Sequence, residues 1–469
     1  MMPLSRRDFL RYSLYSSIAG AGWLGLPKTL TAHAAETDGY KALVCVFLFG
    51  GLDGHDLLIP YDTASYNRFA SIRQSLLNRY DGARARDNLL PLNLANQAAF
   101  GSRAFALPPE MPQLKALFDQ NRAAIVSNVG PLIEPVTAQG FASGSAKLPP
   151  RLFSHNDQQS IWQASAPEGA QFGWGGLFAD AMLSSGANGG VGEFATLSTA
   201  SVGPFLTGTQ VSPYQISLNG NAGINILDGR NASGSQGSLR NFLESARERF
   251  LAQGFEGSNI LAQDIANKFR SGIETNAIFD AARASAPTLS TVFPENGLGS
   301  QLSAVAQTIS IRNSLSTNRQ IFFVGIGGFD THSNQAADLP TLLSQLDGAF
   351  SAFDSAMIEL GLSQNVTTFT ASDFGRTLTV NGDGTDHGWG GNQIVMGGAV
   401  RGNSVFGDVP PADFGHDLDA GNGRQIPTLA VEQFAASLGQ WWGLSDSEII
   451  NALPTLQNFD NANLALFNG

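Results

Sequence analysis

Four largely apolar runs divide the chain and predict strands. They cover residues 42–49, 123–129, 319–327 and 366–371. The first run is apolar at every position, which is typical of a strand with both faces covered, as in a parallel sheet. Apolar residues at helical spacing predict helices at 112–121, 239–284, 302–314, 339–362 and 431–442. Strands and helices that alternate in this way predict an α/β fold, with a mostly parallel central sheet flanked by helices.

Polar residues follow three of these runs directly. Asp53 and His55 follow the first run, Asp330 and His332 the third, and Asp373 and Arg376 the fourth, while His387 stands in a glycine-rich loop at 383–391. In open α/β sheets, ligands bind at the edge formed by the carboxyl ends of the strands. We therefore expect a functional site at this edge. For Asp53 and His55, an ordinary Asp-Gly turn is the alternative.

Another candidate is Ser154, which precedes a predicted helix that starts at His155. Asp157 at the third helical position completes a pattern similar to a capping box. The Ser154 hydroxyl would lie at the positive end of the helix dipole, where it could attack or bind an anionic group with His155 beside it. The alternative is that Ser154 only caps the helix.

The potential ligands are aspartates and histidines, without cysteine. Cys45 is the only cysteine and lies inside the first apolar run, where we expect a buried thiol. Oxygen and imidazole ligands suit Zn, Mn, Mg or Ca, and we expect one or two such divalent ions. Two ions would clamp an in-line displacement at phosphorus or sulfur. Arg376 adds a planar donor fork that suits a tetrahedral anion.

The net charge of the chain argues against two classes of binding partner. The 469 residues carry a formal net charge of −12, which argues against binding to nucleic acid or to an anionic membrane surface. The sequence contains no dinucleotide fingerprint and no cysteine motif for a cluster, so an exported redox enzyme is a weaker interpretation.

The N-terminus predicts export. Ser5-Arg-Arg-Asp-Phe-Leu matches a twin-arginine signal, a weakly apolar stretch follows, and Ala32-His-Ala is a plausible cleavage site. We expect residues 1–35 to be a signal peptide read by the twin-arginine export machinery, and the mature protein to be periplasmic or secreted. No later run is long enough to span a bilayer. Residues 36–469 are then one domain, with a Gly/Ser/Asn-rich cap inserted at about 187–240.

Several motifs together carry a family resemblance. They are the export signal, Gly50-Gly-Leu-Asp-Gly, Phe153-Ser-His-Asn-Asp-Gln, Gly328-Phe-Asp-Thr-His-Ser-Asn-Gln, Ser372-Asp-Phe-Gly-Arg-Thr and Gly384-Thr-Asp-His-Gly. Over about residues 40–440 the chain resembles the bacterial family called domain of unknown function 1501. That family is similar to the alkaline phosphatase and sulfatase superfamily, which has a mostly parallel sheet between helices and metal ligands at strand ends.

The resemblance also implies roles for individual residues. Asp53, Asp330, His332, Asp373 and His387 would match metal ligands of the superfamily, and Ser154 would take the place of its nucleophile. The superfamily usually carries a histidine at the position of Phe374. His55 or His155 could supply that missing imidazole.

These observations predict an exported, metal-dependent hydrolase. Its substrate would be a phosphate or sulfate ester of a small molecule or a glycan. The alternative is an exported protein without catalytic activity, which kept the fold for binding or for assembly of the cell envelope.

Overall fold

The computed structural model describes residues 35–201, 203–218, 260–460 and 463–468, and residues 35–469 form one compact unit. The predicted signal peptide lies outside the described residues, apart from Ala35. No helix in the described ranges is long and apolar enough to cross a membrane.

The central sheet has the strand order β13-β5-β12-β9-β1-β8-β6-β7, and β14 also pairs with β5. Only β12 among these strands runs antiparallel to its neighbours, so the sheet is mostly parallel, as predicted. The strands are β1 (Lys41–Leu48), β5 (Ala123–Gly130), β6 (Thr196–Ser198), β7 (Tyr214–Gln215), β8 (Arg319–Ile326), β9 (Val366–Ser372), β12 (Gly391–Met396), β13 (Val405–Phe406) and β14 (Leu429–Ala430). The four predicted strands are thus confirmed as β1, β5, β8 and β9.

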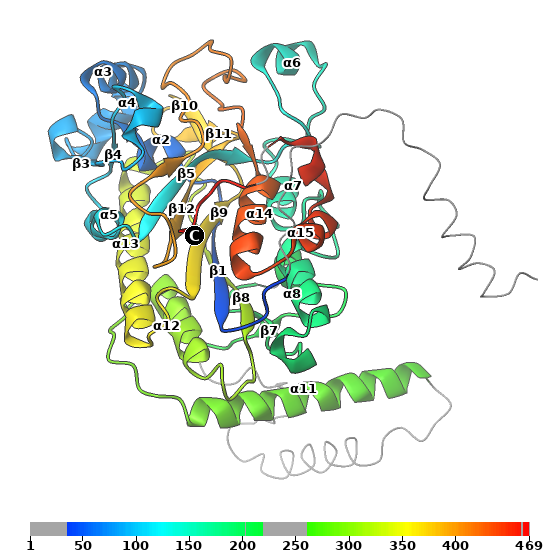
Figure 1. Ribbon diagram of the computed structural model, residues 1–469. Coiled ribbons are helices and arrows are strands. Elements are labelled where there is room, and N and C mark those ends of the chain that lie inside the picture. Colours follow the sequence, from blue (N-terminus) through cyan, green and yellow to red (C-terminus); the bar gives the residue numbers. More distant parts are fainter. Residues whose placement is uncertain (1–34, 202, 219–259, 461–462, 469) are drawn as a thin grey trace, which may run out of the picture. The chain divides into compact units, whose positions relative to one another are not determined.

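Helices cover both faces of this sheet (Figure 1). The helices are α2 (Gly54–Leu57), α3 (Thr63–Ile72), α4 (Gln74–Leu77), α5 (Pro112–Asp119), α6 (Ala138–Ser143), α7 (His155–Ala164), α8 (Trp174–Ser184), α11 (Ile260–Ala284), α12 (Gly297–Ser310), α13 (Gln335–Glu359), α14 (Val431–Trp442) and α15 (Asp446–Ala452). Side chains of α5, α12 and α13 share one core with Ala42, Val44 and Val46 of β1. Side chains of α8, α14 and α15 share the other core with Leu43, Cys45 and Phe47. Alternate residues of β1 therefore enter opposite cores, which explains why this strand is apolar at every position from Ala42 to Leu48.

Two small sheets accompany the central one. One contains β2 (Ile59–Pro60), β3 (Leu90–Pro91) and β4 (Phe105–Leu107), and the other is the hairpin of β10 (Arg376–Val380) and β11 (Thr385–His387). In the hairpin, Arg376 pairs with His387. This pairing brings the glycine-rich loop back over the end of β9.

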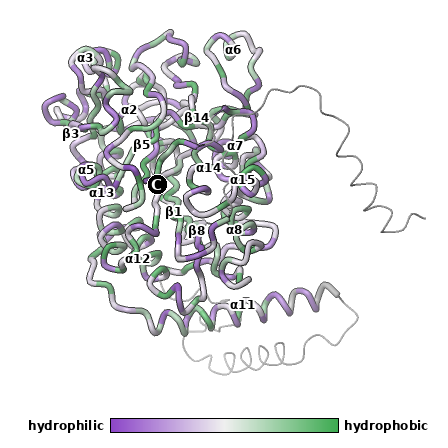
Figure 2. The backbone as a smooth tube through the Cα atoms, in the orientation of Figure 1, coloured by the Kyte–Doolittle hydropathy of each residue, from purple (hydrophilic) through white to green (hydrophobic). Residues whose placement is uncertain are grey.

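The described part of the predicted cap at 187–240 joins the central sheet. Within it, β6 pairs with β8 and β7 pairs with β6, so these short strands extend one edge of the sheet. Residues 219–259 lie outside the described residues, and with them the last part of the predicted cap and the first part of the helix predicted at 239–284. The described part of that helix is α11, along which Figure 2 shows polar and apolar segments mixed.

Candidate metal centre

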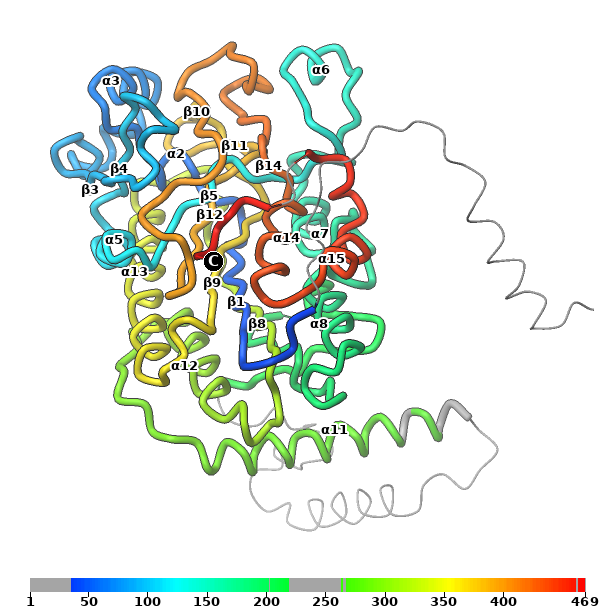
Figure 3. The backbone as a smooth tube through the Cα atoms, in the orientation of Figure 1, coloured from blue at the N-terminus to red at the C-terminus, as the bar shows by residue number. Residues whose placement is uncertain are grey.

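The site lies where β1, β8 and β9 end side by side. Strand β1 pairs in parallel with both neighbours, and Leu48 faces Ile326 on one side and Ser372 on the other (Figure 3). Gly50 lets the chain after β1 pass close to the chain after β8. Its φ is +115°, and a Cβ atom there would lie 2.3 Å from the backbone nitrogen of Asp330. The segments that follow the three strands therefore meet, as predicted.

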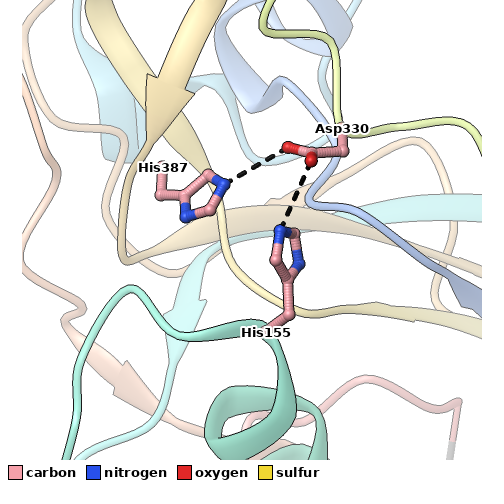
Figure 4. A group of neighbouring side chains, drawn as sticks. All are labelled: His155, Asp330 and His387. Atoms are coloured by element: carbon pink, nitrogen blue, oxygen red, sulfur yellow. Dashed lines mark hydrogen bonds and ion pairs between the residues drawn. The ribbon is translucent and has the colours of Figure 1, made fainter.

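Three imidazole rings and one carboxylate converge at this edge. The Asp330 Oδ1 atom lies 3.1 Å from His332 Nε2 and 3.3 Å from His387 Nε2. Its Oδ2 atom lies 3.5 Å from His155 Nε2. Figure 4 shows Asp330 between His155 and His387, which come from different segments of the chain. We call His155, Asp330, His332 and His387 the convergent cluster.

Hydrogen bonds on the far side of two rings fix their tautomers. The Nδ1 atom of His387 lies 2.7 Å from the carbonyl oxygen of Phe153, and Nδ1 of His155 lies 2.6 Å from Asp373 Oδ2. Because a carbonyl oxygen and a carboxylate can only accept, both Nδ1 atoms carry the hydrogen. In the neutral rings, the Nε2 lone pairs then face the cluster, as in histidines that bind metals.

The arrangement fits a cation. The Nε2 atoms of His332 and His387 lie 2.8 Å apart, and two lone pairs at that distance repel unless a proton or a metal ion lies between them. Ligand atoms of His155, Asp330 and His387 all lie within 4.8 Å of one another. The donor set of imidazoles and one carboxylate is common for divalent transition metals.

Neighbouring charges set the protonation of the cluster. Burial raises the pKa of Asp330, but the hydrogen bond and the charge of Arg376 outweigh it, and the pKa lies below its usual value. The hydrogen bond from His155 to Asp373 raises the pKa of His155. Burial lowers the pKa of His387. An ionised Asp330 beside a neutral His387 is the combination that a metal site requires.

Asp373 is one contact away from the cluster. Its side chain is fully buried, and its Oδ2 atom also accepts a hydrogen bond of 2.8 Å from Gln159 Nε2. Its Oδ1 atom accepts from the backbone nitrogen of Gly50 at 3.1 Å. In this structure the Asp373 oxygens orient His155 and the loop after β1, and the role of Asp373 as a metal ligand stays a prediction.

Asp53 and His55 lie outside the cluster. The Asp53 carboxylate is buried and forms an ion pair of 2.7 Å with Arg73. It also accepts from the backbone nitrogen of His55, so it caps the short helix α2. Burial lowers the pKa of His55 to about 4. The structure thus places Asp53 and His55 in the turn that was the alternative, and their role as metal ligands stays a prediction.

Arg376 holds the Asp330 carboxylate of the cluster in position. Its side chain is buried, and it donates from Nη1 to Asp330 Oδ1 and to the carbonyl oxygen of Gly50, each at 3.0 Å. Its Nε atom donates to Thr385 Oγ1 at 2.9 Å, and Nη2 donates to the Thr385 carbonyl oxygen. These bonds direct the guanidinium toward Asp330 and Thr385, and contact of Arg376 with a substrate anion stays a prediction.

Ser154 is the residue before α7, but its hydroxyl does not cap the backbone of the helix. It donates to Asp157 Oδ2 at 3.1 Å instead. The hydroxyl is half-buried and next in sequence to His155, and its role as a nucleophile stays a prediction.

Phe374 explains which histidine completes the site. Its ring packs against His387, with ring centroids 4.4 Å apart, and against His155, with centroids 4.9 Å apart. The imidazole that could have stood at this position comes instead from His155 on α7. Of the two histidines that the sequence offered, His155 and not His55 lies in the cluster.

Other residues of the site could not be found from the sequence. Phe153 contributes a backbone carbonyl at a φ of +72°, and no side-chain pattern signals this role. Arg424 donates from Nε to the His387 carbonyl oxygen at 2.9 Å, and its guanidinium lies over the Phe153 ring. Asp386, adjacent to His387 in the sequence, lies 3.4 Å from His332 Nδ1. Phe153 and Asp386 both lay within motifs that the sequence had marked, but neither was assigned a role there.

The chain belongs to the family described as "Protein of unknown function (DUF1501)", which its sequence matches over residues 40–453. This confirms the resemblance seen in the sequence. A comparison with curated protein sequences gave no match.

Several solved structures resemble the chain, with TM-scores below 0.5. The PsFucS1 sulfatase from Pseudoalteromonas sp. is 10% identical, with 92% of this chain and 73% of that chain covered and a TM-score of 0.35. The lipoteichoic acid synthase LtaP from Listeria monocytogenes is 7% identical, with 81% and 70% covered and a TM-score of 0.28. A mutant of the alkaline phosphatase PafA is 10% identical, with 73% and 64% covered and a TM-score of 0.27. The activity of this chain therefore has to be inferred from its own residues.

Proposed function

We propose that the protein is an exported, metal-dependent hydrolase that acts on a phosphate or sulfate ester. The observation that carries this proposal is the convergent cluster, in which the Nε2 atoms of three histidines lie 3.1–3.5 Å from the Asp330 carboxylate. His155, Asp330, His332 and His387 would hold a divalent metal ion. The ester would belong to a small molecule or a glycan, and the protein would reach the periplasm or the exterior through the twin-arginine machinery.

The donor set favours Zn or Mn among the four metals that the sequence left open. Mg and Ca prefer oxygen ligands and seldom take several imidazoles. Three histidines and one aspartate would be a poor set for either of them. Zn and Mn accept mixed nitrogen and oxygen ligands.

The side chains around the cluster have separate tasks in this proposal. A bound divalent ion would supply Lewis acidity toward an oxygen of the ester. Asp373 and the Phe153 carbonyl hold the rings of His155 and His387 in one tautomer and one orientation. Arg376 holds the Asp330 carboxylate in place and keeps it ionised.

Arg424 is our candidate for contact with the free oxygens of the ester. It is half-buried beside His387, and its guanidinium carbon lies 5.1 Å from the centroid of the Phe153 ring. Its Nε and Nη1 atoms donate to the carbonyl oxygens of His387 and Gly421. Nη2 forms no hydrogen bond with the described part of the chain, so it is available to an anion.

Ser154 is the proposed nucleophile, with a water molecule as the competing one. The hydroxyl lies at the start of α7, where the helix dipole favours an anion. A Ser154→Ala variant distinguishes the two. Turnover should fall to background if the hydroxyl attacks, and should persist if water does.

The proposal is tested by metal content and turnover together. Protein purified without chelator is analysed by mass spectrometry for metals and assayed with aryl phosphate and aryl sulfate esters. We expect stoichiometric metal and turnover of at least one ester class, and the loss of both in Asp330→Asn and His387→Ala. His416→Ala is the matched control, because His416 lies in a loop outside the cluster, where its Nδ1 accepts from a backbone nitrogen.

Two results would contradict the proposal. Protein without metal, even after addition of divalent ions, would favour the alternative of an exported binding or envelope-assembly protein. Unchanged metal content in both cluster variants would show that any metal is bound elsewhere.

A further inference from the structure

We infer that the site holds a single divalent ion, and that the guanidinium of Arg73 supplies a fixed positive charge where a second ion would otherwise be needed. This inference rests on the metal centre of the proposed function. Three carboxylates, Asp53, Asp330 and Asp373, follow the adjacent strands β1, β8 and β9. A two-metal centre needs a second set of ligands, so the question is whether Asp53 or Asp373 can supply it.

The Asp53 carboxylate has no free lone pair for a metal. Its Oδ2 atom accepts from Arg73 Nη1 at 2.7 Å and from Gln335 Nε2 at 2.6 Å. Its Oδ1 atom accepts from Arg73 Nη2 and from the backbone nitrogen of His55, each at 3.1 Å. A carboxylate offers about four lone-pair sites, and all four have donors here.

Arg73 is fixed as firmly as its partner. Its side chain is buried, with Nε donating to the Leu378 carbonyl oxygen at 3.1 Å and Nη2 donating to the Thr377 carbonyl oxygen at 2.7 Å. An arginine stays protonated at any ordinary pH. The pair of Asp53 and Arg73 is therefore neutral as built, and it does not require a metal ion for neutralisation.

The charge around the cluster agrees with one ion. Three carboxylates and one guanidinium belong to the cluster or contact it, which gives a net charge of −2. The carboxylates are those of Asp330, Asp373 and Asp386, and the guanidinium is that of Arg376. One divalent ion balances that charge, whereas a second ion would leave an excess of positive charge without a carboxylate to offset it.

The neutral pair also supports the cluster mechanically. Gln335 donates to Asp53 through Nε2, while its Oε1 atom accepts from Thr385 Oγ1 at 2.8 Å. Thr385 Oγ1 in turn accepts from Arg376 Nε, and Arg376 donates to Asp330. Gln335 is thus a positioning residue that connects the buried pair to the Asp330 ligand.

The test is a metal count on the intact protein. Zn and Mn are titrated by calorimetry into metal-stripped protein, and bound metal is counted by mass spectrometry. We expect one equivalent in the unaltered chain, one equivalent in Asp53→Asn, and none in Asp330→Asn. Circular dichroism of each variant establishes that it is folded.

Each outcome decides between the possibilities. Two equivalents in the unaltered chain overturn the inference, as does loss of metal from a folded Asp53→Asn. If Asp53→Asn does not fold, the count in the unaltered chain decides. One equivalent of metal without ester turnover would contradict the proposed hydrolase activity but agree with a single ion. Two equivalents with ester turnover would agree with the hydrolase activity but contradict the single ion. No metal at all would contradict both.

Discussion

Two groups of acidic residues at the same edge of the sheet have opposite environments. In the convergent cluster, Asp330 is 43% exposed in its side chain and faces the Nε2 atoms of three histidines. Asp53, in contrast, is buried and contacts Arg73 and Gln335. We call Asp53, Arg73 and Gln335 the arginine-paired layer. The same residue type follows parallel neighbouring strands in both cases.

The two environments distinguish a carboxylate that can bind a metal ion from one that stabilises the fold around the metal site. A buried carboxylate that already has an arginine partner is neutralised inside the protein and stabilises the fold. Asp330 also has an arginine partner, Arg376, but its carboxylate is partly exposed and faces the Nε2 atoms of three histidines, so a metal ion can bind there. Arg376 connects the convergent cluster to the arginine-paired layer. It donates to Asp330 and to Thr385, and Thr385 donates to Gln335.

The largest expected effect is on the arginine-paired layer. Arg73→Ala leaves the Asp53 carboxylate buried without its counter-charge, and the free energy of unfolding should fall by about 3–5 kcal/mol. Arg68→Ala removes an exposed ion pair with Asp413 and should lower the free energy of unfolding far less, because solvent screens such a pair. Urea denaturation of both variants measures this. Equal losses of stability in the two variants would contradict the prediction that the buried ion pair matters more than the exposed one.

The second prediction concerns the residue that orients His155. Asp373→Asn should weaken metal binding by about 10–100-fold, because the Nδ1–H of His155 loses its carboxylate acceptor. Asp347→Asn is the control, since Asp347 is also buried but accepts from the backbone of α5. Competition with a chelator of known affinity measures the difference. Unchanged affinity in Asp373→Asn would mean that His155 does not bind the metal.

The third prediction concerns acid stability next to the arginine-paired layer. The pKa of His55 is lowered to about 4 by burial, so the unfolded chain takes up a proton near about pH 6.5 while the folded chain does not. Stability should therefore fall as the pH falls, by about 2 kcal/mol between about pH 7 and about pH 5. In His55→Gln this part of the pH dependence should disappear, and in His416→Gln it should remain. Denaturation at both pH values tests it, and the same slope in both variants would contradict it.

The smallest expected effect is at the rim of the cluster. Arg424→Ala should raise KM for the ester about tenfold with kcat less affected, which corresponds to the loss of one charge-assisted hydrogen bond. Arg401→Ala is the matched control, because Arg401 also lies over a phenylalanine ring, that of Phe406. An equal change in both variants would assign Arg424 to the fold and not to the substrate.

Local pattern determined most of the central fold. The largely apolar runs of β1, β5, β8 and β9 could be read directly from the sequence, and residues 42–48 of β1 are all apolar because both faces of that strand are buried. Helix α14 was predicted at its observed bounds, since its apolar spacing extends over its whole length. Helix α13 begins at Gln335, four residues before the predicted start, because its first turn is polar. The short strand β6 carries too little pattern to be assigned, whereas β7 begins the alternating run at 214–218 that is typical of a strand.

The sequence by itself determined which segments meet at the site, and it supplied Asp330, His332 and His387 for the convergent cluster. Only the tertiary structure decided that His155 joins them and that Asp53, His55 and Asp373 do not. The reason is that a ligand and a support differ in their partners, which come from distant parts of the chain. Arg73 turns a carboxylate into a buried ion pair, and the Phe153 carbonyl turns an imidazole toward the cluster. Sequence spacing carries no record of such contacts.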